Sequence, residues 1–73
     1  MTDHTETMQI RVNGEAREVR TGITAAELLE ELDLAGRRLA LEVNEAIVPR
    51  SRFEQHRLQP GDRVEVVQAI GGG

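Results

Sequence analysis

The segment ITAAELLEEL restricts the fold most, because it carries the local signals of a short helix that buries one face. Thr24 is followed three residues later by Glu27, the spacing of a capping box, in which each side chain binds the other residue's backbone N–H. Ile23 lies directly before the cap and can pack on Leu28 as a hydrophobic staple. The apolar positions recur at helical spacing and are Ala25, Leu28, Leu29 and Leu32. The segment therefore predicts a helix that packs by one side.

Before this helix, alternating apolar and polar residues predict a β-hairpin. Residues 8–12 alternate in this way, with Met8, Ile10 and Val12 on the apolar side. The dipeptide Asn13-Gly14 then suits the positive φ values of a type I′ turn. Residues 15–20 are expected to return antiparallel, with Val19 pointing inward.

After the helix, for which Gly36 is a suitable terminator, the alternation resumes. Residues 39–43 predict a third strand, and Ile47-Val48 a very short fourth strand that Pro49 stops. The irregular stretch that follows is expected to be anchored to the core by Phe53 and Leu58. Gln59–Asp62 reads as a turn, and a last strand begins near residue 64.

These elements predict an α+β fold of the β-grasp (ubiquitin-like) type, with a mixed sheet of four to five strands and one main helix. A single amphipathic helix can cover one face of such a sheet and leave the other face to water. The last strand is expected to lie parallel to the first, through a right-handed crossover. Residues 1–7 are expected to form a flexible leader, residues 8–70 the domain and residues 71–73 a flexible glycine tail.

The composition argues against an active site of the chain's own. The 73 residues include no cysteine and no lysine, and no phosphate-binding loop or catalytic motif occurs. His4 and His56 have no plausible metal-ligand partner nearby, so no metal site is expected. The net charge of −4 disfavours nucleic acid, and no apolar run approaches membrane-spanning length. The sequence predicts a cytoplasmic protein.

The final residues, QAIGGG, favour a function for the C-terminal segment, although a flexible end of no function is the alternative. Glycines lack Cβ atoms, so Gly71, Gly72 and Gly73 can thread a narrow channel in a partner's active site. Just before them, Val67, Ala69 and Ile70 are apolar, and alternation turns Val67 and Ala69 away from the helix. Apolar residues on an open sheet face can mark a docking site, so this group is predicted to contact partners.

From Met8 onward the chain resembles the ThiS family, the small sulfur carriers of thiamine biosynthesis. The segments that carry the resemblance are MQIRVNG, TAAELLEEL, LALEVNEAIVPR, LQPGDRVEVVQAI and the terminal Gly72-Gly73. The resemblance implies that a ThiF-like adenylating enzyme, using ATP and magnesium, activates the carboxylate of Gly73. Sulfur from a cysteine desulfurase or a relay protein would then convert it to a thiocarboxylate. A ThiG-like thiazole synthase would consume this product, so the chain is expected to be a carrier rather than an enzyme and to bind no cofactor itself.

Two other functions fit the same pattern. Sulfur carriers for molybdopterin or cysteine synthesis share the fold and the Gly-Gly end. Alternatively, the chain could be a non-covalent β-grasp interaction module in which the sheet binds and the tail is idle.

Overall fold

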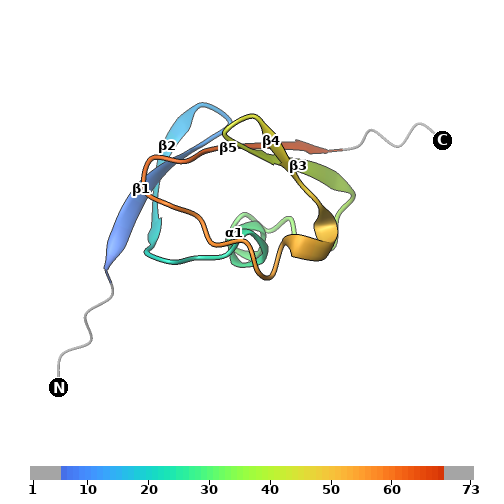
Figure 1. Ribbon diagram of the computed structural model, residues 1–73, viewed down its shortest axis with the longest axis horizontal. Helices are drawn as coiled ribbons and strands as arrows, with labels where there is room; N and C mark the ends of the chain where they lie inside the picture. The colour runs from blue at the N-terminus through green and yellow to red at the C-terminus, as the bar shows by residue number, and fades with distance from the viewer. Residues whose placement is uncertain (1–5, 69–73) are drawn as a thin grey trace, which may run out of the picture.

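The computed structural model describes residues 6–68, which form a five-stranded sheet and one α-helix (Figure 1). The elements, in chain order, are β1 (Thr7–Val12), β2 (Glu15–Arg20), α1 (Ala25–Glu31), β3 (Leu39–Val43), β4 (Ala46–Val48), the 3-10 turn η1 (Arg50–Arg52) and β5 (Arg63–Gln68). The strand order is β2-β1-β5-β3-β4, with β1 and β5 parallel and the other pairs antiparallel. This arrangement confirms the predicted mixed sheet, its single helix and the parallel pairing of first and last strands.

Both hairpins turn through two residues with positive φ. In the first, Asn13 and Gly14 have φ values of 51° and 86°, as the type I′ prediction requires. In the second, Asn44 and Glu45 have φ values of 52° and 71°. Because that turn uses only two residues, β4 begins at Ala46, one residue earlier than predicted. The first strand also begins one residue early, and Thr7, expected in the leader, pairs with β2.

The hydrophobic core lies between α1 and the sheet face that α1 covers. Its members come from every strand, from the helix and from the connections around them: Met8, Ile10, Val19, Ile23, Ala25, Leu28, Leu41, Val43, Val48, Leu58 and Val64. Ile23 and Leu28, the predicted staple, are both completely buried. Phe53 is partly buried and packs against this core, so both predicted anchors, Phe53 and Leu58, reach it. Full burial of one such aliphatic side chain contributes about 1.5–3 kcal/mol, which makes these contacts the main source of stability.

The sequence predicts Gly36 as the helix terminator, but α1 ends earlier, at Glu31, with Leu32 as its C-cap residue. Asp33 takes the left-handed conformation, with φ 62°, directly after the C-cap residue Leu32. The N–H of Asp33 donates to the Glu30 carbonyl at 3.0 Å, and the N–H of Leu34 donates to the Leu29 carbonyl at 2.8 Å. These two bonds are those of a Schellman motif. A residue with a side chain therefore ends the helix, and Gly36 lies in the next turn.

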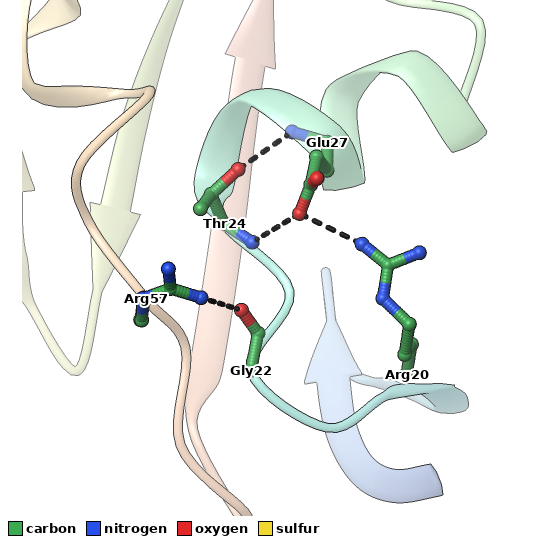
Figure 2. A network of polar contacts seen from close by, with 5 residues as sticks. All are labelled: Arg20, Gly22, Thr24, Glu27 and Arg57. Carbon is green, nitrogen blue, oxygen red and sulfur yellow. Dashed lines mark hydrogen bonds and ion pairs between the residues drawn. The ribbon is translucent and has the colours of Figure 1, made fainter. Parts of the chain in front are cut away.

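The capping box at the other end of α1 is present as predicted (Figure 2). The Glu27 N–H donates to Thr24 Oγ1 at 3.2 Å, and Glu27 Oε1 accepts from the Thr24 N–H at 3.0 Å. Arg20 adds an ion pair to the same carboxylate oxygen at 2.9 Å. The segment after η1 lies alongside, where the Arg57 guanidinium donates to the Gly22 carbonyl at 2.9 Å. Charged side chains from the end of β2 and from the segment after η1 thus stabilise the start of the helix.

Backbone carbonyls after η1 complete the helix N-terminus. The N–H of Ala25 donates to the His56 carbonyl and the N–H of Ala26 donates to the Phe53 carbonyl, both at 2.9 Å. Since the first four N–H groups of a helix have no partner within it, these bonds and the cap satisfy groups that would otherwise be costly to bury. They tie the long connection before β5 to the helix.

Candidate functional site

The candidate site is the exposed face of the sheet together with the C-terminal end of β5. Of the site residues predicted from sequence, Gly71, Gly72 and Gly73 lie outside the described residues, as do Ala69 and Ile70. Val67 is the predicted site residue that the structure describes. The described part of the site is therefore β5 with the strands β1 and β3 beside it and β4 beyond β3.

Val67 lies on the sheet face opposite α1, as predicted. Its side chain is 57% exposed, whereas Val64, three residues earlier on β5, belongs to the core. Its partner across the strand pair is the exposed Ala40 of β3. Val67 does not belong to the core, and apolar residues on an open sheet face can mark a docking site.

The structure adds Ile47, a residue that the sequence pattern did not predict to belong to the site. Ile47 is 71% exposed, and among the described residues Ile47 and Val67 are the large hydrophobic residues that are exposed to solvent. Its strand β4 pairs with β3, which in turn pairs with β5. The sequence contained a signal for this position. Side chains alternate between the two faces of a sheet along a strand, so Ile47 must point outward if Val48 is buried.

Two glutamates lie beside these apolar residues on the same face. Glu42 of β3 is paired in register with Ile47 on one side and with Glu65 of β5 on the other. Like charges directly opposite each other on neighbouring strands destabilise a sheet. The exposed face therefore combines two apolar side chains with an acidic pair on β3 and β5 and a basic pair, Arg11 and Arg63, on β1 and β5.

The position of β5 determines where the C-terminal residues begin. β5 lies between β1 and β3, and its register with β3 runs without interruption from Val64 to Gln68. Gln68 is the last described residue and precedes Ala69 in the sequence. The chain thus reaches residue 69 from a strand at the centre of the sheet.

Two further features bear on the predicted function. Within residues 6–68, no group of three or more His, Asp or Glu side chains is placed to hold a metal ion. Over the same residues, no helix has the length and apolar character needed to cross a membrane.

Comparison with known proteins gives one consistent family. The ThiS family model matches residues 10–73. The sulfur carrier protein ThiS of Escherichia coli is 44% identical over 66 residues, which span 90% of this chain and the whole of that protein. A thiazole synthase of Paramagnetospirillum magneticum is 41% identical over 66 residues, which span 90% of this chain and 20% of that protein.

A solved structure agrees. The crystal structure of the thiamine biosynthesis protein ThiS from Geobacter metallireducens matches with a TM-score of 0.79 and 30% identity, over 90% of this chain and the whole of that one. The match confirms the β-grasp fold. Sequence, family model and structure together show that the chain belongs to the ThiS family.

Proposed function

We propose that the chain is a sulfur carrier of thiamine biosynthesis whose cargo is held as a thiocarboxylate on Gly73. The observation that carries the proposal is that a ThiS-family chain reaches its last glycines from β5, the central strand of the sheet. The family match continues to residue 73, so it includes the glycines that would carry the chemistry.

The chemistry begins with activation of the carboxylate. A terminal carboxylate has an ordinary pKa of about 3.3–3.7, so it is ionised at neutral pH and can attack the α-phosphate of ATP. Pyrophosphate leaves and an acyl adenylate forms, with magnesium and ATP bound by the adenylating enzyme. A cysteine persulfide on the sulfur donor then attacks the acyl carbon and AMP leaves, which gives an acyl disulfide. A second thiol then attacks the donor's cysteine sulfur and forms a disulfide with it. The bond to the outer sulfur breaks, and the thiocarboxylate leaves.

The chain's own residues have two roles in this scheme. Gly71 and Gly72 would pass through the partner's channel, where side chains would widen the segment and displace the carboxylate. Val67, Ala69 and Ile70 would contact the partner, and Ile47 extends this surface across the sheet. The chain is a substrate of other enzymes in this proposal and holds neither ATP nor magnesium itself.

Thiazole synthase is the proposed consumer of the sulfur. In the relative from P. magneticum, a segment similar to this chain belongs to a protein named thiazole synthase. This occurrence in one polypeptide supports a functional pairing of the carrier fold with that enzyme, and it favours the thiazole pathway over molybdopterin or cysteine synthesis. The adenylating enzyme and the sulfur donor are proposed from their chemistry, as a ThiF-like enzyme and a cysteine desulfurase or relay protein.

The test is intact-mass spectrometry after incubation with ATP, magnesium, a ThiF-class adenylating enzyme, a desulfurase with cysteine, and a thiol. The mass is expected to rise by the difference between sulfur and oxygen. A chain lacking Gly73 should keep its mass and its fold, as judged by circular dichroism. The E. coli relative serves as a positive control for the enzymes. An unchanged mass while the relative is converted would contradict the proposal, and partner binding that survives without the glycines would favour a non-covalent module.

A further inference from the structure

Two asparagines bind the backbone of β5 from opposite sides, and both follow a valine in a hairpin turn. On the β1 side, Asn13 Oδ1 accepts from the Val66 N–H at 2.8 Å. On the β3 side, Asn44 Oδ1 accepts from the Arg63 N–H at 2.9 Å. The asparagine backbones bind as well, because the N–H of Asn13 donates to the Val64 carbonyl at 2.8 Å and that of Asn44 to the Arg63 carbonyl at 2.7 Å.

The two asparagines hold different ends of the strand. Asn44 binds Arg63, the first residue of β5, and its amide nitrogen also donates to Asp62 Oδ1 at 3.0 Å. Asn13 instead binds Val66, two residues before the last described residue of the strand. Asn13 is therefore the contact closer to the C-terminal segment.

Asn13 replaces a missing strand neighbour. β1 and β5 are paired in register only at Arg11 with Arg63 and at Val12 with Val64. Beyond Val12 the chain turns into the first hairpin, while β5 continues to Gln68. The side-chain oxygen of Asn13 thus takes the place of a backbone carbonyl that β1 no longer supplies to Val66. On the other side, β3 remains paired with β5 throughout this stretch.

We propose that Asn13 is a positioning residue for carboxylate activation: it fixes the direction in which β5 leads into the C-terminal residues. The inference rests on the proposed function of Gly73. Removal of the Asn13 side chain would leave β5 paired with β3, so the sheet would persist while Val66 loses its hold on the β1 side. A residue that positions the reacting carboxylate affects the rate of the chemical step, because displacing a reacting group by about 1 Å can lower the rate about 10²-fold.

The variants are chosen to keep the turn. Asn13 has a φ of 51°, which glycine adopts without strain, so N13G removes the side chain and preserves the backbone. N13D keeps an acceptor oxygen at the same place. N44G is the matched control, because Asn44 has the same conformation and also binds β5, but at the end remote from the tail.

Two measurements are made on each variant: hydrogen exchange at the Val66 amide, and thiocarboxylate formation with a ThiF-class adenylating enzyme, ATP, magnesium and sulfide. N13G is expected to exchange faster at Val66 and to lower kcat about tenfold or more, with KM within about twofold. N13D is expected to restore both properties toward wild type. N44G is expected to keep kcat within about twofold at a temperature where it is fully folded.

The outcomes separate this inference from the proposed function. Wild-type protein that is never converted overturns the proposed function, and the positioning role with it. Wild-type and N13G proteins converted at equal kcat overturn the positioning role alone. An equal loss of kcat in N44G also overturns it, because the cause would then be general loosening of β5.

Discussion

Glu42 on β3 and Glu65 on β5 are directly opposite each other on the exposed face of the sheet. Like charges in this arrangement destabilise a sheet, and no ion pair among residues 6–68 involves either glutamate. The same face carries a basic pair, Arg11 and Arg63, so like charges are opposite each other at two places on the surface that bears Ile47 and Val67.

The E65Q substitution is expected to stabilise the free protein by about 0.2–1 kcal/mol, because it removes this repulsion. Urea unfolding at low ionic strength measures the change. The gain should shrink in high salt, which screens exposed charges. E15Q removes the same charge at a residue paired with Val12, and it provides the control for net charge. Equal stabilisation by E15Q would contradict an effect of the glutamate pair.

The D33G substitution is expected to raise the free energy of unfolding by up to about 1 kcal/mol, because the left-handed conformation costs a residue with a side chain roughly 1–2 kcal/mol. Asp33 holds this conformation at the end of α1, with φ 62°. Its negative charge also lies at the unfavourable end of the helix dipole. D33N removes the charge and keeps the side chain, so thermal unfolding of both variants separates the two effects. A D33G protein less stable than D33N would contradict this account.

The pKa of Glu27 is lowered from its ordinary value of 4.5, first by the hydrogen bond from the Thr24 N–H and further by Arg20. A carboxyl group with a lowered pKa in the folded state stabilises the protein above its ordinary pKa. That contribution is lost as the pH falls below 4.5 and through the lowered pKa. The wild-type protein should therefore lose more stability than E27Q between neutral pH and this acid range. Urea unfolding across the range measures the difference, and parallel curves would refute the role of Glu27.

The V67E substitution is expected to raise KM for the adenylating enzyme about tenfold or more, because it places a charge at an apolar contact. Unfolding curves should change little, since Val67 is 57% exposed. Q9E adds the same charge to the same sheet face on β1; because Gln9 is paired with Glu18, its unfolding curve is measured as well. Residue 9 lies about 20 Å from residue 67 along the strand direction, six residues at about 3.3 Å each. An equal rise in KM for Q9E would point to net charge rather than to docking at Val67.

The elements that sequence predicts well here are those decided by neighbouring residues. The capping box at Thr24 and Glu27 and the turn at Asn13-Gly14 each lie within four residues, so the local pattern contains the whole interaction. The alternation of apolar residues likewise assigns Ile10 and Leu41 to the core. Local signals and the final fold agree at these positions, which is typical of sequences that fold cooperatively.

What sequence does not predict depends on distant residues or on unfavourable conformations. The bond between Asn13 and Val66 joins residues 53 apart, and the pairing of Glu42 with Glu65 depends on strand register. Glycine is the usual residue after a helix end, so the sequence predicts Gly36 there, yet Asp33 adopts the required conformation. Glu45 similarly occupies a turn position that normally selects glycine or asparagine.

β5 is the middle strand of the sheet, and it is the last in chain order of the strands that the structure describes. The hairpins β1–β2 and β3–β4 are joined within the sheet only through β5, so a nascent chain holds two separate hairpins until β5 emerges. An isolated two-stranded hairpin is marginally stable in water. Assembly of the sheet must therefore wait until β5 has been synthesised, and a polypeptide interrupted before Arg63 cannot form it. A chain truncated before β5 is therefore expected to stay unfolded and open to proteases.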